Sequence, residues 1–372
     1  MSTETLEADV AILGAGLAGS IAAHTLSQQG HDVLLVDCLA PLPDPLQAEK
    51  IEPDQAALFR SLGLLDERVP AADRIGVVMN YDGHGIEEFD TVEQYGISYF
   101  DTVARFREMA GHRARMESAA VRWLRPDPVR PRVGLSDGRE VSVRLVVLAT
   151  EGNRALPEGL SLGRVVDETL CSLSYGFDLE GLDSDFAGFN YFLGKNSDSV
   201  DFLTTFRVGD RVRAHVFTQQ DPRDPAVLEA SSSMDQALKS WFPDLATHLG
   251  TASVSSPVQL LTAIYHRVRD PGAVEGVAII GEEFQSVSPA TGAGLTHTLT
   301  DVKVLCERYA PGWLASPRSE VRTFYGDPEK LAADRTAYSH WCYYRDRQAW
   351  DRVPFHIRAL RKARDIGLGH RD

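Results

Sequence analysis

The strongest constraint on the fold of this chain is a glycine-rich turn near its start, which reads Gly14, Ala15, Gly16, Leu17, Ala18, Gly19. The turn follows an apolar run at 10–13 and precedes a stretch at 18–29 with helical spacing. A second apolar run at 32–36 comes next and ends at Asp37. A strand, a glycine turn, a helix and a second strand in this order form a βαβ unit. The sequence therefore predicts an α/β fold with a parallel sheet.

Each glycine of this G-x-G-x-x-G turn has its own physical role. Gly14 permits the tight turn, Gly16 lets the backbone approach a pyrophosphate, and Gly19 lets the helix pack closely on the strand. The first helical residues, Leu17 and Ala18, present N–H groups and the positive end of the helix dipole to a phosphate. We expect Asp37, at the end of the second strand, to accept hydrogen bonds from ribose hydroxyls.

A glycine turn without a ligand is the alternative, and the agreement of strand, glycines, helix and acid argues against it. The motif is shared by FAD and NAD sites, so by itself it leaves both cofactors open.

A second glycine-rich turn stands far along the chain. The apolar run 277–280 is followed by Gly281 and Glu282, and then by Pro289, Gly292, Ala293 and Gly294, which open a helix carrying Asp301. This helix start again offers N–H groups to an electron-rich edge. Two such helix starts could hold the two ends of one long cofactor, and FAD has that length.

This arrangement resembles the p-hydroxybenzoate-hydroxylase-like (group A) FAD-dependent monooxygenases over about residues 9–308. In that family a late Gly-Asp pair contacts the ribityl chain, and a P-x-x-G-x-G loop faces the flavin. Pro289, Gly292, Gly294 and Asp301 match the pattern, and the Gly-Asp pair is Gly281-Glu282 in this chain. The resemblance implies FAD as cofactor.

Five positions depart from the family pattern. Glu282 and Glu151 each stand where the family has Asp, which keeps a carboxylate and lengthens it by one methylene. Thr296 stands at a usual Asn, and Tyr99 at a usual Arg. Lys50 is a candidate cofactor contact in place of another arginine, although a solvated lysine is an equal alternative.

The resemblance and the strand pattern together predict a Rossmann-type FAD-binding domain interleaved with an antiparallel-sheet substrate domain, followed by C-terminal helices. Strand-like alternation with many aromatic residues over 169–218 marks the antiparallel sheet. The expected boundaries are 1–75, 98–168 and 268–316 for the FAD-binding domain and 76–97 and 169–267 for the substrate domain. A charged helical region, 317–372, is expected to cap the surface.

The resemblance also implies the chemistry. A single G-x-G-x-x-G leaves no second dinucleotide domain, so NADPH or NADH would act as a transient reductant. Reduced flavin and O2 would give a flavin C4a-hydroperoxide, which transfers one oxygen atom to a small, often phenolic, substrate. The candidate pocket residues are Tyr175, Tyr191, Phe202, Phe206, His215, Phe217 and His297. Sheet core is the alternative for the aromatic residues, and packing or a helix-surface position for the histidines.

Three other functions stay open on the sequence. A flavin-dependent halogenase shares the fold, but its W-x-W-x-I-P signature is missing and all five tryptophans are isolated. A reductase of prenyl-type substrates is a further option. A non-catalytic FAD-binding protein is the third, because Glu151 and Glu282 replace the usual Asp residues of the family.

Composition narrows the partners and the location. The net charge of -15 argues against a nucleic-acid surface, which needs clustered lysine and arginine. The four cysteines have neither metal-ligand nor disulfide-like spacing, so no metal site is expected. The first residues lack a signal-peptide pattern, and no apolar run approaches the roughly 18 residues of a membrane span. We therefore expect a cytoplasmic protein that meets a small-molecule substrate and O2.

Overall fold

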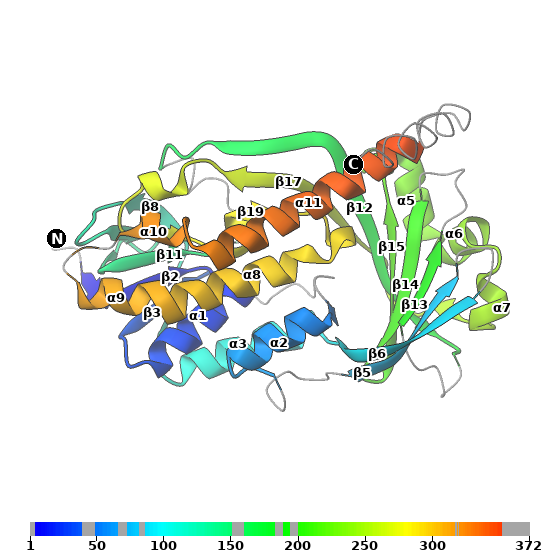
Figure 1. Cartoon of the computed structure of the whole chain (residues 1–372), viewed down its shortest axis with the longest axis horizontal. Coiled ribbons are helices and arrows are strands. Elements are labelled where there is room, and N and C mark those ends of the chain that lie inside the picture. The colour runs from blue at the N-terminus through cyan, green and yellow to red at the C-terminus, as the bar shows by residue number, and fades with distance from the viewer. Residues whose placement is uncertain are drawn as a thin grey trace, which may run out of the picture.

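The computed structural model of the chain (Figure 1) describes its structure over the ranges given next. These are residues 4–38, 49–65, 73–81, 86–150, 160–182, 189–193, 200–316, 318 and 320–351. Glu151, Gly152 and Arg154 lie outside the described residues.

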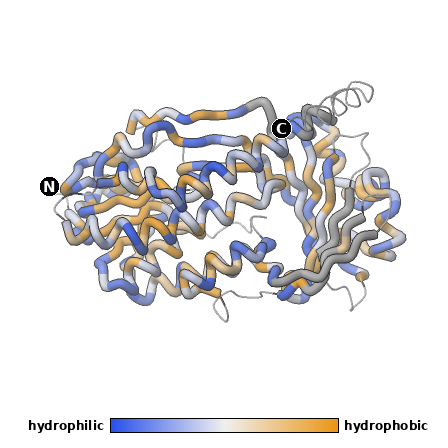
Figure 2. The backbone as a smooth tube through the Cα atoms, in the orientation of Figure 1, coloured by the Kyte–Doolittle hydropathy of each residue, from blue (hydrophilic) through white to orange (hydrophobic). Residues whose placement is uncertain are grey.

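A parallel sheet of five strands forms the centre of one half of the molecule (Figure 1). Its strand order is β18 (Val277–Ile279), β11 (Leu145–Leu148), β2 (Val10–Leu13), β3 (Val33–Asp37) and β7 (Arg115–Ser118). Every residue of β2, β11 and β18 is buried. Apolar strands of this kind are typical of a parallel sheet covered on both faces, and Figure 2 shows apolar residues gathered along them. The predicted α/β fold is confirmed.

Residues of one strand face two different cores. Val10 and Ile12 pack with the helices on one face, whereas Ala11 and Leu13 pack on the other face. The first face is covered by α1 (Leu17–Gln28), α3 (Tyr99–Gly111) and α8 (Ala293–Val304). Helix α8 continues through a π-helical segment, Leu305–Tyr309, into α9 (Ala310–Ala315). The alternation of side chains along a strand produces this division.

A small four-stranded sheet covers the second face. Its order is β1 (Thr5–Glu7), β10 (Glu140–Ser142), β9 (Arg132–Leu135) and β8 (Val121–Arg125). Strands β9 and β10 are antiparallel, and Gly138 between them has a φ of +90°. Alternating apolar residues around Asp137 and Gly138 predict a hairpin turn, and the structure confirms it.

A large sheet, antiparallel except where β13 pairs with β5, forms the other half of the molecule (Figure 1). Its order is β19 (Gln285–Ser286), β17 (Gln259–Val268), β12 (Arg164–Glu180), β15 (Arg211–Thr218), β14 (Val200–Val208), β13 (Phe189–Leu193), β5 (Asp73–Tyr81), β6 (Ile86–Gly96) and β4 (Lys50–Ile51), with β16 (Ser253–Val254) beside β12. Strands β12 and β17 are long enough to reach from this sheet toward the parallel sheet (Figure 1). The predicted antiparallel sheet is thus present.

The remaining helices are short except for α11. They are α2 (Pro53–Ser61), α5 (Pro225–Ser232), α6 (Met234–Trp241), α7 (Leu245–Leu249), α10 (Val321–Phe324) and α11 (Pro328–Asp351), with 3-10 turns at Pro271–Ala273, Gly281–Glu283 and Pro289–Thr291. None of the described helices is both long enough and apolar enough to cross a bilayer.

Three sequence-based expectations need correction. The sequence pattern over 226–241 predicts a single helix, but the structure has two, because Ser233 leaves the helical conformation with φ -133° and ψ 43°. Helical spacing near 102–116 predicts a helix there, but the helix runs from Tyr99 to Gly111 and residues 115–118 form β7. Ser98 accepts the Asp101 N–H as its N-cap. The C-terminal region does more than cap the surface, because Lys330 and Trp341 of α11 are fully buried.

Candidate functional site

The glycine turn is held so tightly that two of its positions accept no side chain. Gly14 has a φ of +101°, and a Cβ there would lie 2.4 Å from the Ala149 carbonyl oxygen. A Cβ on Gly19 would lie 1.9 Å from the Gly14 carbonyl oxygen. Gly16 is the N-cap of α1, and no side chain caps that helix start. The backbone N–H groups of the first turn are therefore suited to an anionic ligand.

Asp37 closes this turn from the neighbouring strand. Its Oδ2 accepts the Ala15 N–H at 2.6 Å. Arg107 of α3 donates from Nε to the Ala15 carbonyl at 2.5 Å and lies 3.9 Å from Asp37. Arg107 could not be predicted from the sequence, because it lies 92 residues from Ala15 along the chain and no local motif marks it. The ribose contact of Asp37 stays a prediction.

A cavity of about 640 Å³ joins segments from the start, middle and end of the chain. From the predicted cofactor set it is lined by Leu17, Lys50, Glu282, Pro289, Gly292 and Gly294, and from the predicted substrate set by Tyr175, Phe202, Phe206, His215 and Phe217. Ligand sites in proteins commonly have this size. The structure thus brings the two predicted sets to one cavity.

Several predicted residues are not part of the cavity wall. They are Gly14, Gly16, Ala18, Gly19, Asp37, Gly281, Ala293 and His297. Tyr191 pairs through its backbone with Thr204 in β14, and its side chain lies outside the described part of the structure.

Glu282 reaches the cavity from a 3-10 turn that follows β18. Gly281 needs its glycine there, because its φ is +63° and a Cβ would lie 3.1 Å from the Ala18 Cβ. The Gly281 N–H donates to Asp301 Oδ2 at 3.0 Å. Burial raises the pKa of the Glu282 carboxyl above its ordinary value.

A buried ion pair that the sequence analysis missed stands beside Glu282. Glu283 is fully buried, pairs with Arg164 and accepts the Thr150 hydroxyl at 2.8 Å. Arg164 lines the cavity, and so does His266, whose Nε2 lies 3.0 Å from the Glu282 carbonyl oxygen. The apolar run before Gly281 does not indicate that Glu283 is buried and paired with Arg164.

At the other end of the cavity His215 forms a pair with a buried glutamate. His215 Nε2 lies 3.1 Å from Glu49 Oε2, and Arg213 Nε lies 3.2 Å from the same oxygen. Arg213 also lies 3.1 Å from Asp178. The rings of Phe206 and Phe217 stand edge-on to His215, at centroid distances of 5.8 and 6.1 Å. His215 is therefore held by a polar contact with Glu49 as well as by aromatic packing.

Tyr175 serves both the sheet core and the cavity wall. Its ring contacts Trp241 at a centroid distance of 5.6 Å, and its hydroxyl donates to Gln220 at 2.7 Å. Burial raises its pKa to about 12. The Tyr175 hydroxyl is thus neutral at ordinary pH and already has a partner.

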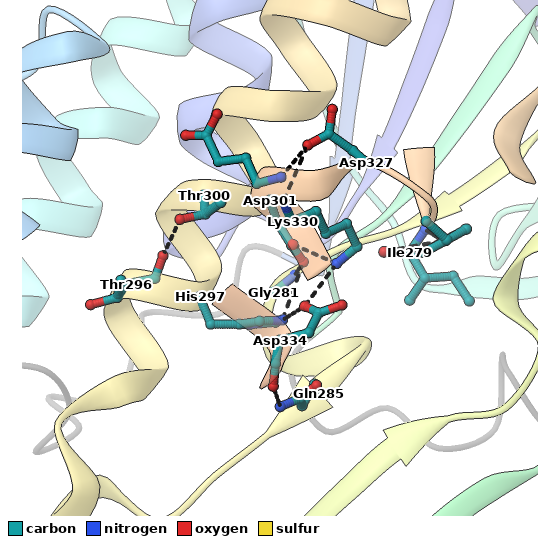
Figure 3. Close-up of polar contacts among 12 residues, drawn as sticks. Ile279, Gly281, Gln285, Thr296, His297, Thr300, Asp301, Asp327, Lys330 and Asp334 are labelled. Atoms are coloured by element: carbon teal, nitrogen blue, oxygen red, sulfur yellow. Dashed lines mark hydrogen bonds and ion pairs between the residues drawn. The ribbon is translucent and has the colours of Figure 1, made fainter. Parts of the chain in front are cut away.

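His297 is placed differently from either expectation. It is 2% exposed, so it is not on the helix surface, and it is absent from the cavity wall. Its Nε2 lies 3.1 Å from Asp334 Oδ1 (Figure 3). Its ring stacks on Phe284 at a centroid distance of 5.9 Å. The 3.6-residue helical repeat turns His297 toward α11, while Leu295 and Thr298 line the cavity.

His297, Asp301 and Asp334 converge as metal ligands could, but a lysine already supplies their cation. Lys330 Nζ lies 2.6 Å from Asp301 Oδ1 and 3.3 Å from Asp334 Oδ1 (Figure 3). It also lies 3.9 Å from the centre of the Phe284 ring. The cluster is therefore best described as a buried lysine with two carboxylates.

Comparison with known proteins identifies the fold. Residues 7–116 match a family model described as "FAD binding domain". The solved structure of p-nitrophenol 4-monooxygenase PnpA from Pseudomonas putida DLL-E4 superposes with a TM-score of 0.74 at 15% identity, over 97% of this chain and 93% of that one. The flavin-dependent brominase Bmp2 superposes with a TM-score of 0.72 at 15% identity, over 94% and 91%. This chain has the group A flavoprotein monooxygenase fold.

A curated relative has a similar sequence over a longer protein. Squalene epoxidase 3 from Arabidopsis thaliana is 23% identical over 338 residues, which are 82% of this chain and 60% of that protein. The chain thus spans about 60% of the length of this relative.

The residues present fit FAD in the group A fold. The uncapped start of α1 suits the pyrophosphate, and Glu282 is placed to receive hydroxyl donors from the cavity. Gly292 has a φ of +65° and begins α8, and its carbonyl accepts Gln55 Nε2 at 2.9 Å. Gln55 also donates to Thr296, the residue at the family's Asn position. Thr296 thereby helps to hold the loop between Pro289 and Gly294.

Proposed function

We propose that this protein is an FAD-dependent monooxygenase that inserts one oxygen atom from O2 into a small aromatic or phenolic substrate, with NADPH or NADH as reductant. One observation carries the proposal. A single cavity runs from Leu17 and Glu282, at the predicted cofactor positions, to a wall of aromatic side chains around His215 and Glu49. FAD, when bound, supplies the redox chemistry, and the protein supplies position and a dry, shaped site.

The cofactor end of the cavity is built by backbone more than by side chains. The uncapped N–H groups of α1 hold the pyrophosphate, and Glu282 accepts ribityl hydroxyls. The turn from Pro289 to Gly294 presents N–H groups at the start of α8. Lys50, which lies 2.5 Å from Glu52, stands on the same wall as a candidate cofactor contact.

The substrate end combines apolar contact with one proton acceptor. Phe202, Phe206 and Phe217 provide ring surfaces on which an aromatic substrate packs. A neutral His215 that donates its Nε2 proton to Glu49 keeps Nδ1 as an acceptor for a substrate hydroxyl. Glu49, which Arg213 holds, fixes the imidazole in place, so His215 is positioned to bind and to accept the proton of a phenol.

A halogenase is the second candidate, because the brominase Bmp2 has a similar fold. The five isolated tryptophans favour the monooxygenase. Oxygen uptake and product mass, measured with and without bromide, separate the two activities. A brominated product would support the halogenase.

His215→Gln tests the proposed function directly. We expect kcat/KM for phenol-dependent NAD(P)H oxidation to fall by about 100-fold, as for loss of a general base. His112→Gln, on an exposed residue at the end of α3, is the matched control and should behave like the unchanged protein. Equal rates for the two variants would remove His215 from the site.

A further inference from the structure

We propose that the cavity selects neutral aromatic compounds with a hydroxyl group and excludes aromatic carboxylates. The inference rests on the proposed function and specifies the substrate class of the same site. It follows from the charged groups that the structure describes on the cavity wall.

The cations of this wall already face carboxylates. Lys50 Nζ lies 2.5 Å from Glu52 Oε1, and Arg164 pairs with the fully buried Glu283. The Arg164 side chain is itself 8% exposed. A substrate carboxylate at Arg164 would therefore compete with the buried Glu283, whose charge is left uncompensated if it is displaced, and at Lys50 it would compete with the partly exposed Glu52.

A further carboxylate on the wall, Glu49, would repel a substrate anion. Glu49, with 1% of its side chain exposed, shares one oxygen between Arg213 and His215. Like charges in a site of low dielectric interact strongly, so a bound carboxylate would be destabilised.

The same wall is complementary to a neutral phenol. The rings of Phe202 and Phe217 lie 4.6 Å apart between centroids and give an apolar surface. His215, paired with Glu49, is suited to accept a hydrogen bond from a hydroxyl donor. An uncharged ring with one hydroxyl thus satisfies the wall without a new buried charge.

Two probes of nearly equal shape separate the classes. p-Cresol and p-hydroxybenzoate share a ring and a phenolic hydroxyl and differ in a methyl or a carboxylate. At neutral pH both phenols are protonated, because phenols titrate near about 10, whereas a carboxyl titrates near about 4 and is ionised. We would titrate the FAD-loaded protein with each compound by calorimetry and expect p-cresol to bind at least about tenfold more tightly.

Variants test which residues cause the selection. Glu49→Gln should reduce the ratio of the dissociation constant of p-hydroxybenzoate to that of p-cresol. Glu93→Gln is the control, because it removes the same charge from a pair with Arg60 outside the cavity, and it should leave this ratio unchanged. Glu52→Gln is the second variant. Glu52 is partly exposed, and without its charge the Lys50 ammonium can pair with a substrate carboxylate. It should strengthen p-hydroxybenzoate binding severalfold.

Equal or tighter binding of p-hydroxybenzoate by the unchanged protein would overturn the inference, and so would failure of p-cresol to bind. Oxidation of NAD(P)H tests the proposed function separately from this selection. NAD(P)H oxidation driven by p-hydroxybenzoate and not by p-cresol would overturn the selection and keep the monooxygenase. Selective p-cresol binding, with no phenol driving NAD(P)H oxidation, would keep the selection and contradict the monooxygenase.

Discussion

Asp301 joins Lys330 to the backbone of Gly281. Its Oδ1 lies 2.6 Å from the Lys330 ammonium, and its Oδ2 accepts the Gly281 N–H at 3.0 Å. Asp301 and Lys330 are both fully buried. The C-terminal helix α11 is thereby tied to the loop that carries Glu282 (Figure 3).

Lys330→Met should destabilise the protein strongly. The substitution leaves Asp301 and Asp334 buried beside each other without a cation, and the loss of one partner of a buried pair typically costs about 3–5 kcal/mol. Urea unfolding measures the change in the free energy of unfolding. We also expect weaker FAD binding, because the Gly281 N–H loses a fixed acceptor.

Lys303→Met is the matched control for this prediction. Lys303 joins the same two helices through Glu329 at 2.9 Å, but both side chains are partly exposed. Partly exposed pairs contribute about 1 kcal/mol or less. Losses of equal size in the two variants would contradict a special role for the buried lysine.

Glu282→Ala should weaken FAD binding by removing an acceptor for the ribityl hydroxyls. A hydrogen bond to a charged group contributes about 1.5–3 kcal/mol, so the FAD dissociation constant should rise by about tenfold to 100-fold. Flavin fluorescence during titration of the FAD-free protein gives this constant. An unchanged value would refute the assignment of Glu282 to the cofactor.

Glu282 should also affect how the stability of the FAD-free protein depends on pH. Its pKa is raised above the ordinary value of 4.5 by burial, so the folded protein holds this proton more tightly than the unfolded chain. The resulting stability is present below pH 4.5 and is lost as pH rises from 4.5 through the raised folded pKa.

Glu282→Gln has no titrating carboxyl at this position, so it should not lose stability in this way as the pH rises. The free energy of unfolding of the variant minus that of the unchanged protein should therefore increase with pH above 4.5. Denaturant unfolding at a series of pH values measures it. A difference that is constant or falls over this range would show that burial does not control this carboxyl.

Gly19→Ala should disrupt the start of α1. The new Cβ would lie 1.9 Å from the Gly14 carbonyl oxygen, which is backbone and must move. Overpacking of this kind costs about 1–3 kcal/mol, and the displaced turn should also bind FAD less tightly. Thermal unfolding with and without FAD measures both effects.

Gly312→Ala serves as the control, because a Cβ there meets nothing within 4 Å and the residue lies in α9. Alanine in a helix is favoured over glycine by about 1 kcal/mol, so this variant should be as stable as the unchanged protein or more so. A Gly19→Ala protein as stable as Gly312→Ala would contradict the close packing at the turn.

The sequence predicted the fold where local patterns are strong. The glycines at 14, 16 and 19 and the apolar runs at 10–13, 145–149 and 277–280 specify the turn and the parallel strands, because their periodicity reflects burial on both faces. The break at Ser233 was missed, since serine has no strong helix-ending signal in the middle of a helical pattern.

The site was predictable in part for the same reason. Glycine turns leave a local signature, but ion pairs between distant residues do not. Glu49 meets Arg213 and His215 of β15 only because the fold places the segment before β4 beside that strand. Lys330 and Arg164 are likewise explained by tertiary contacts, which no spacing within the sequence reveals.

The absorption spectrum of the FAD-loaded protein tests the central claim most directly. We predict that NADPH or NADH, added without oxygen and in the presence of p-cresol, bleaches the flavin bands, and that admitting O2 restores them. Such a cycle shows that the bound flavin takes electrons from the nucleotide and passes them to oxygen. A protein that retains no FAD, or flavin bands that neither nucleotide bleaches, would contradict the proposed monooxygenase.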